Sequence, residues 1–421
     1  MTRTRWIAAA VFAVGVAEVR SEAIVSAREL QGSGYGEYWT ARVPLVGGDR
    51  VVALHLLDEN LYAGTSSGLW FALQADTGLV RWAASAGEHV AVLYPPTHLR
   101  SDSADGPVVL TTHGWVKVLD RYRGELVRDI ELPLPASAAA AADAESMYIG
   151  GGDSRFYSLR WCGDPRAGGL VRWHATLDGL VTSAPVISHD GRVFFATDKG
   201  SVYCIRGADK ALLWQSCRCA TVSGGLHVDE SGVYVASSDH RLYVLDEQTG
   251  DAISRYLLPG PLFDTPVVVQ RTVYQYCRGA GMFAYDTDTR DAMWNLADVT
   301  RFVARAAEKL VAMDAGGDLV FLDNDTGALR GSMALPESAM AAENGRDAVL
   351  YLAMPDGRVM CAKPSGFPYL RREQLVDARL GLHKPPGPGA SGETPSRADA
   401  PGADGARGAV PDPLRSGRRS Q

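Results

Sequence analysis

Residues 61–82, LYAGTSSGLWFALQADTGLVRW, decide the fold of this chain. Residues 61–64 and 69–73 are short runs of apolar and aromatic residues bounded by Gly, Ser and Asp, which is the pattern of a β-hairpin. Asp76-Thr77-Gly78 supplies a second turn, because Asp bonds its own backbone and Gly accepts a positive φ. Trp82 then falls in a third strand. One such meander is too small to bury its own face, so it needs neighbours.

The chain repeats this meander at a period of roughly 40 residues, a length at which each repeat is one supersecondary unit. The copies lie at residues 147–173, 193–214, 233–250, 273–294 and 310–327, with weaker copies at 107–124 and 350–360. Four strands per unit predict an all-β propeller, because radial closure leaves only short sheet edges. The number of copies predicts eight four-stranded antiparallel blades, with seven as the alternative.

The repeats share the form apolar-Tyr-apolar-Gly/Ala, then Gly, then apolar-Tyr-apolar-apolar-Asp-x-x-Thr-Gly-x-x-x-Trp. This form resembles the PQQ-like repeat over about residues 37–363. That β-propeller family includes quinoprotein dehydrogenases and the BamB subunit of the outer-membrane assembly machinery. The resemblance implies the propeller fold, but it leaves the function open, because one fold serves unrelated functions.

The N-terminal region predicts export and ring closure. Arg3 and Arg5 precede a short apolar run, 6–16, so residues 1–17 are expected to be a signal peptide, with an uncleaved signal anchor as the alternative. The first cysteine is Cys162, so the lipidation that BamB carries is not expected. Residues 18–36 are interpreted as a loose leader. Residues 38–43 look like a last strand without its first three, and they are expected to complete the blade of the C-terminal copy.

The predicted propeller spans residues 37–366, and the pattern stops there. Residues 367–383 are expected to form a short extension with some helical spacing. Residues 384–421 are rich in Pro, Gly, Ala and Ser and have no aromatic residue, so they predict a disordered tail.

Composition agrees with one large folded domain of modest charge. The chain has 421 residues, 46% of them hydrophobic, and a formal net charge of −7. No basic patch suited to nucleic acid is present in the sequence. Cys217 and Cys219 would share one face of a strand with a separation near the upper limit for a disulfide. They are interpreted as small core residues, with metal ligation as the alternative.

Tryptophan recurs once per repeat at one equivalent position. The series comprises Trp39, Trp82, Trp173, Trp214 and Trp294. A residue that recurs with each blade is best explained by packing between adjacent sheets, although an aromatic site for a quinone or a sugar is the alternative. Trp70, Trp115 and Trp161 fall outside this position and are candidates for a local surface role.

The acidic turns at residues 286–288 and 323–327 resemble the start of a calcium loop. Ala334 stands where the full loop after Asp323 needs its final Glu, so turn capping is the favoured interpretation. No G-x-S-x-G, H-E-x-x-H or P-loop pattern occurs. The histidines are not spaced as a constellation; they include His55, His113, His174, His227 and His240.

The resemblance to quinoproteins would imply a pair of adjacent cysteines against the cofactor and Glu, Asn and Asp ligands for calcium. The sequence has no Cys-Cys dipeptide and no matching ligand set. We therefore expect an exported, non-catalytic, monomeric scaffold in the periplasm or outside the cell, without cofactor, metal or catalytic residues. It would bind a protein through rim loops or the central funnel, with the insertions at 98–106 and 162–168 as candidate loops, in envelope or outer-membrane protein assembly. A quinoprotein-like oxidoreductase and a ligand-binding sensor are the alternatives.

Overall fold

The computed structural model describes residues 23–87, 93–99, 106–162, 169–216, 219–306 and 308–366. All of them lie in one unit, residues 1–383. The predicted signal peptide (1–17), C-terminal extension (367–383) and tail (384–421) lie outside the described residues.

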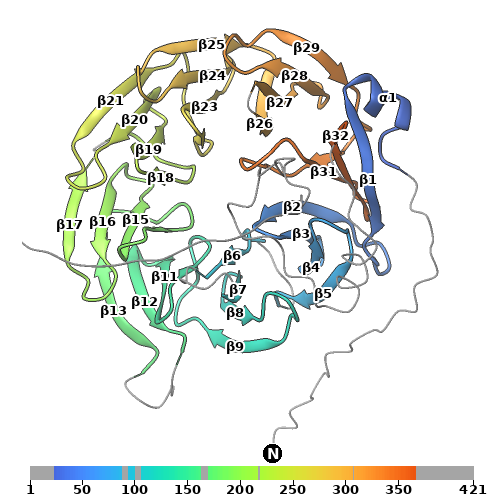
Figure 1. Cartoon of the computed structure of the whole chain (residues 1–421). Helices are drawn as coiled ribbons and strands as arrows, with labels where there is room; N and C mark the ends of the chain where they lie inside the picture. Colours follow the sequence, from blue (N-terminus) through green and yellow to red (C-terminus); the bar gives the residue numbers. More distant parts are fainter. Residues whose placement is uncertain are drawn as a thin grey trace, which may run out of the picture. The chain divides into compact units, whose positions relative to one another are not determined.

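Eight four-stranded antiparallel sheets follow one another around a ring, as Figure 1 shows. The structure therefore confirms the β-propeller and the count of eight blades, and it rules out seven. Each hydrophobic cluster joins neighbouring blades; one, for example, unites Phe194 and Trp214 with Val233 and Leu245 of the next blade. The core is thus a series of seams between adjacent sheets.

Blades 1 to 4 follow in chain order from the second strand of the protein. Their strands are β2 Val51–Leu57, β3 Asn60–Thr65, β4 Leu69–Gln74, β5 Val80–Ser85; β6 Thr97–His98, β7 Val108–Thr111, β8 Trp115–Leu119, β9 Leu126–Glu131; β10 Ala141–Ala142, β11 Ser146–Gly151, β12 Arg155–Arg160, β13 Val171–Thr176; β14 Val186–Ile187, β15 Arg192–Ala196, β16 Val202–Arg206 and β17 Leu212–Ser216.

Blades 5 to 8 complete the ring, and the last blade also takes the first strand of the chain. Their strands are β18 His227–Asp229, β19 Gly232–Ser237, β20 Arg241–Leu245, β21 Ala252–Leu257; β22 Val267–Val269, β23 Thr272–Cys277, β24 Gly281–Asp286, β25 Ala292–Leu296; β26 Val299–Ala306, β27 Lys309–Asp314, β28 Leu319–Asp323, β29 Leu329–Met333; β30 Met340–Ala341, β31 Leu350–Ala353, β32 Arg358–Pro364 and β1 Tyr35–Arg42.

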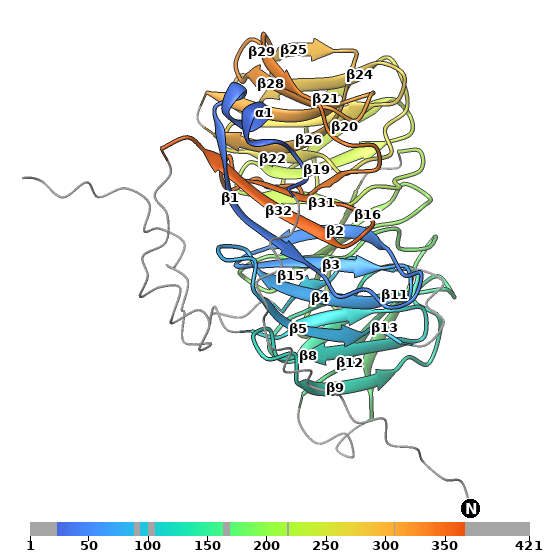
Figure 2. The same cartoon turned by 90° about the vertical axis from the view of Figure 1, so that its right-hand side faces the viewer.

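The ring closes through β1, which pairs antiparallel with β32 from Tyr35↔Pro364 to Arg42↔Arg358. Figure 2 shows the two strands running side by side. The predicted closure is therefore confirmed, but the strand begins at Tyr35 rather than at residue 38. Because β1 supplies the outermost strand of blade 8, no blade is left with three strands.

The interpretation of residues 18–36 as a loose leader is wrong for the described part of that segment. A short helix, α1 Ala27–Gly32, begins at Ser26 with a reciprocal capping box to Glu29. Ile24, Val25 and Leu30 are buried in the cluster that joins blades 7 and 8. Burial of these side chains orders the segment.

The antiparallel order gives the propeller two different faces. Turns between the first and second strands, and between the third and fourth, lie on one face, which we call the turn face. Turns between the second and third strands lie on the other face together with the connections from blade to blade, and we call it the connection face.

Candidate functional site

The five recurrent tryptophans join each blade to the next one. Each indole N–H donates to a backbone carbonyl in the third turn of the following blade. The bonds are Trp39 to Ala75 (2.9 Å), Trp82 to Arg121 (2.9 Å), Trp173 to Gly207 (3.2 Å), Trp214 to Glu247 (3.0 Å) and Trp294 to Asn324 (2.8 Å). The packing interpretation of the series is therefore confirmed, and these donors are already engaged.

A glycine lies beneath four of these rings. A Cβ added at Gly250 would lie 2.6 Å from the Trp214 ring, and Gly250 has a φ of +74°. Gly78 under Trp39, Gly124 under Trp82 and Gly327 under Trp294 repeat this arrangement. The D-x-x-T-G turn thus ends in glycine both because of its backbone conformation and because an indole covers it.

The three described tryptophans outside this series differ in environment. Trp70 is 1% exposed, so the surface role suggested for it is wrong. Trp161 is half-buried and donates to the Asp143 carbonyl at 2.8 Å. Trp115 is 41% exposed, where β8 begins on the connection face, and it remains available for contact.

The acidic turns are capped turns. The Asp286 carboxylate accepts the backbone N–H groups of Asp288 (2.8 Å) and Thr289 (2.7 Å), and the bond from Thr289 is the largest cause of its lowered pKa. Asp323 accepts both the N–H and the hydroxyl of Thr326. The turn-capping interpretation is confirmed. Among the described residues, no group of three or more His, Cys, Asp or Glu is placed to hold a metal ion.

Cys219 lies in the buried cluster that joins blades 4 and 5, so its interpretation as a core residue is confirmed, and it is also disulfide-bonded. Cys217 lies outside the described residues. The thiols of Cys162, Cys204, Cys277 and Cys361 are free, and burial raises the pKa of Cys204 to about 12. That thiol is therefore protonated and unreactive at neutral pH.

The structure brings together one histidine network that sequence analysis missed. His98 on β6 of blade 2 places Nδ1 at 2.6 Å from Asp58 Oδ2 and Nε2 at 2.8 Å from the Tyr62 hydroxyl. The Asn60 amide donates to the same hydroxyl at 3.2 Å. The imidazole therefore bridges the Asp58 carboxylate of the first turn of blade 1 and the Tyr62 hydroxyl on β3.

The contacts of this network hold blades 1 and 2 together. Tyr62 is wholly buried, and burial raises its pKa above its usual range, so its hydroxyl cannot reach a substrate. The bond from His98 is the largest cause of the lowered pKa of Asp58. Arg121 of blade 2 also lies 3.4 Å from the carboxylates of Asp58 and Glu59. The exposed end of the network is the Asp58 carboxylate.

The described histidines named from sequence do not converge with this network. His55 on β2 and His227 on β18 lie on innermost strands, His113 and His240 lie in turns of the connection face, and His174 is on an outermost strand. Burial, aided by Arg301, lowers the pKa of His55 to about 4, so it is uncharged at neutral pH.

Loop 342–349 of blade 8 lies against the inner edge of blade 7. The Asn344 N–H donates to the Val303 carbonyl at 2.7 Å, and Arg301 on β26 donates to the Ala341 carbonyl at 2.7 Å. Glu343 reaches solvent, but the protein that surrounds it raises its pKa, while Arg301 and His227 act in the opposite direction.

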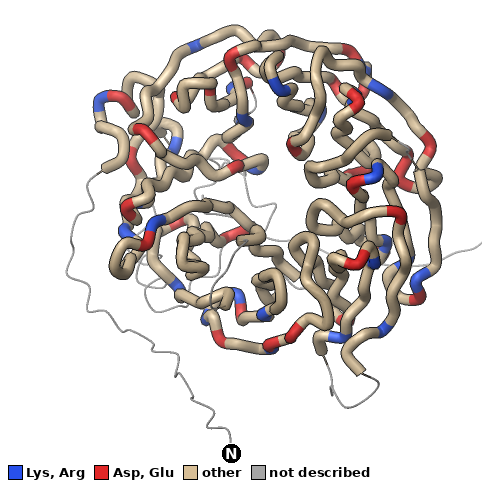
Figure 3. The backbone as a smooth tube through the Cα atoms, turned by 180° about the vertical axis from the view of Figure 1, so that it is seen from behind, with Lys and Arg blue, Asp and Glu red and all other residues tan. Residues whose placement is uncertain are grey.

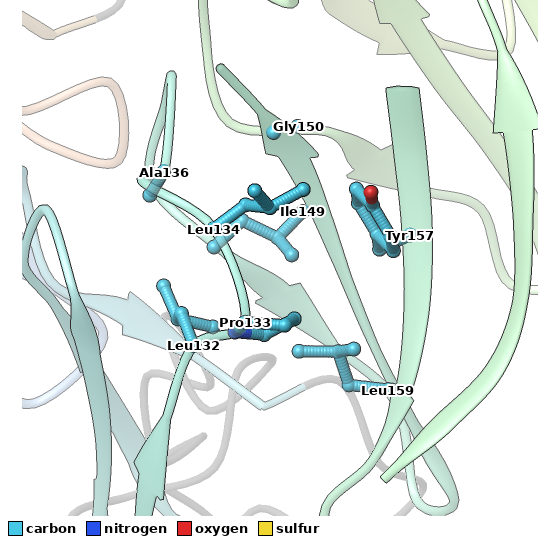
Figure 4. Close-up of a pocket in the computed structure, with 9 residues that line it drawn as sticks. Leu132, Pro133, Leu134, Ala136, Ile149, Gly150, Tyr157 and Leu159 are labelled. Atoms are coloured by element: carbon cyan, nitrogen blue, oxygen red, sulfur yellow. The ribbon is translucent and has the colours of Figure 1, made fainter. Parts of the chain in front are cut away.

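A small apolar cavity lies between blades 2 and 3. Figure 4 shows Leu132, Pro133 and Leu134 facing Ile149 and Tyr157. Its volume of about 10 Å³ holds at most a single water, too little for an organic ligand.

Charge is spread around the ring. In Figure 3, acidic and basic positions alternate along the tube without one sector of a single sign. None of the described helices is both long enough and apolar enough to cross a membrane.

Comparison with known proteins agrees with this architecture. A family model described as outer membrane protein assembly factor BamB matches residues 198–371. The crystal structure of BamB from Moraxella catarrhalis is similar, with a TM-score of 0.61 at 15% identity over 80% of this chain and 99% of that chain. The C-terminal WD40 domain of Sif2 gives a TM-score of 0.60 at 11% identity over 79% and 99%. At these identities the likeness shows the fold alone.

One curated protein matches a shorter stretch. The β-alanine-activating enzyme of Danio rerio is 31% identical over 98 residues, which are 22% of this chain and 8% of that enzyme. The match thus spans less than a tenth of the enzyme's length. The eight blades, the Trp-on-Gly seams and the matching family model lead to one conclusion: the chain is an eight-bladed β-propeller whose residues 198–371 match the model of the PQQ-like repeat family.

Proposed function

We propose that this chain is a non-catalytic scaffold of the cell envelope whose turn face binds another protein. Support comes from the matching family model, which is described as an outer membrane protein assembly factor, and from the fold that the chain shares with BamB. A closed propeller suits this role, because its loops vary without disturbing the frame.

The observation that carries the proposal is the placement of the two insertions. The segments at 98–106 and 162–168 connect strands of blades 2 and 3, and both connections belong to the turn face. Residues 100–105 and 163–168 themselves lie outside the described residues. Because the described ends of both insertions belong to the turn face of adjacent blades, that face of blades 2 and 3 is the candidate surface.

The described ends of the first insertion are firmly anchored. Leu99 is 5% exposed, and its N–H donates to the Pro107 carbonyl at 2.9 Å. Arg121 donates to the Gly106 carbonyl at 2.9 Å, while Thr97 donates to the Ala140 carbonyl of blade 3 at 2.6 Å. Anchored ends reduce the conformational entropy that binding must remove.

The test is to replace residues 100–105 with a short Gly-Ser turn while keeping His98, Leu99 and Gly106. The matched control makes the same replacement at 334–339, a connection-face loop. Purified protein is crosslinked in envelope extracts, the captured protein is identified, and its binding is measured with both purified components. We expect the first variant to lose at least ten-fold in affinity at an unchanged melting temperature and the control to keep it. Equal affinity of all three proteins would contradict the assignment to the turn face.

The proposal that the chain is not a catalyst has a separate test. The recurrent tryptophans and turn aspartates are engaged in seams and turns, which supports a structural use of the repeat. The purified protein is incubated with PQQ and calcium and assayed for dye reduction with alcohols and aldoses. Micromolar cofactor binding with turnover would establish the oxidoreductase alternative instead.

A further inference from the structure

Blade 7 departs from the seam that the tryptophans build. In blade 1, Ala72 pairs with Trp82 immediately before the bulge of the outer strand. The corresponding pair in blade 7 is Phe321 with Gly331. A Cβ at Gly331 would meet no atom within 4 Å. Blade 8 also lacks the turn that would receive an indole, because its third and fourth strands come from opposite ends of the chain.

The N-terminal segment covers this seam in place of a tryptophan. Ile24, Val25, Leu30 and Tyr35 share one buried cluster with side chains of blades 7 and 8. Those partners include Leu319, Phe321, Met333, Leu350, Leu352 and Met360. The Tyr35 ring lies 5.5 Å from that of Phe321, and its hydroxyl donates to the Ala348 carbonyl at 3.0 Å. The seam is therefore a groove shaped for one helix and one strand.

The segment that fills the groove is joined to the ring by a connection that turns at Gly47 and Gly48. Residues 43–50 link β1 to blade 1, and Val46 within them is 75% exposed. Gly47 and Gly48 have φ values of +30° and +83° with open space at their Cβ positions. Backbone rotation at these two glycines can redirect β1 without a side-chain clash.

We propose that the groove between blades 7 and 8 also accepts residues 23–42 of a second copy of this chain. The occupant must supply a strand for the open edge of β32 and apolar side chains for the cluster, and the second copy supplies both without any change of sequence. Every contact of the closed monomer is then re-formed between copies. The result is a closed two-fold dimer with exchanged N-terminal segments.

The balance between the two forms depends on the connection and on concentration. Contacts in the groove are identical in both forms, so they do not favour either one. The monomer gains from the high effective concentration of its tethered segment. Exchange therefore requires release of the segment and is favoured when chains unfold and refold at high concentration.

The experiment uses the full chain and a disulfide trap. Arg42 and Arg358 are cross-strand partners at the end of the β1–β32 pair. Arg42→Cys and Arg358→Cys are placed in separate copies that carry different tags. In one sample the copies are mixed while folded, and in the other they are unfolded and refolded together under reducing conditions. Both samples are then oxidised. The double variant in one chain is the control that shows the bond can form there.

We expect the co-refolded sample to give a disulfide-linked dimer that carries both tags. Its yield should rise at least ten-fold as the protein concentration during refolding rises from about 1 to about 100 micromolar. Copies mixed while folded should give little of this dimer. Mass spectrometry of the linked peptides distinguishes a bond between the two introduced thiols from bonds through native thiols. If the double variant forms its internal bond while the mixed copies give no such dimer at any concentration, the groove accepts its own segment only and the proposal is wrong.

Discussion

Replacing Trp214 with alanine should open the seam between blades 4 and 5. The indole is 7% exposed, lies 5.8 Å from the Phe194 ring and donates to the Glu247 carbonyl of blade 5. Emptying a buried aromatic site costs about 3–5 kcal/mol. Repeat proteins derive stability from neighbouring units, so blades 4 and 5 should lose amide protection before the rest of the ring.

The glycine beneath the ring allows a sharper test. Gly250→Ala adds a Cβ 2.6 Å from the indole at a φ of +74°. In the wild-type background this change combines the left-handed backbone cost, about 1–2 kcal/mol, with a clash. With Trp214→Ala only the backbone cost remains. The double variant should therefore be more stable than the sum of the single effects predicts, by about 1 kcal/mol or more.

The measurement is hydrogen exchange at increasing denaturant, read separately for each blade. Leu213→Ala is the matched control, because that neighbour is 39% exposed and should cost little. Equal costs of Gly250→Ala in both backgrounds would show that the indole does not rest on the turn. Unchanged protection of blades 4 and 5 in Trp214→Ala would refute the structural role of the series.

Three further changes test other parts of the ring. His98→Phe removes the imidazole partner of the buried Tyr62 hydroxyl and should cost about 1–3 kcal/mol, part of which the double variant with Tyr62→Phe should restore in denaturant titrations. Arg192 and Ser188 lower the pKa of Asp190 to about 2, so its contribution to stability is present above the unfolded pKa of about 4 and is lost as the pH falls to 2. Asp190→Asn should therefore flatten the unfolding free energy across that window, and an unchanged slope would contradict the ion pair. Deleting residues 23–42 should leave the edge of β32 unpaired, so a monomer with an unaltered melting temperature would refute closure by β1.

The eight blades were predictable because their determinants are local and repeated. Turn residues, alternating strands and the tryptophan of the outer strand recur in sequence, and each copy supports the interpretation of the others. The helix α1 was missed although its capping box, Ser26 with Glu29, stands in the sequence. The helix has only six residues, so its order depends on burial of Leu30 against distant blades.

The hydrogen-bond network of His98 could not be predicted from the sequence. Asp58 and His98 are 40 residues apart and belong to different blades, so no local pattern links them. The burial of Trp70 was equally hard to predict, because its neighbours on β4 are also apolar and do not show which face of the strand is buried. Which face a strand residue takes depends on register, and the register of a single short strand is set by its partners.

The seams without a tryptophan show where the ring is weakest. Blade 5 has Ser254 at this position, and its seam is filled by Tyr256, whose ring lies 4.3 Å from that of Tyr285 of blade 6. Blade 7 uses the N-terminal segment. Blade 2 has Arg128 at this position, and the apolar cavity of Figure 4 lies in its seam with blade 3. Because a cavity forfeits packing contacts, the seam between blades 2 and 3 should open at the lowest free energy. Both insertions border that seam, so the surface proposed for partner binding coincides with the part of the ring that can adapt most readily.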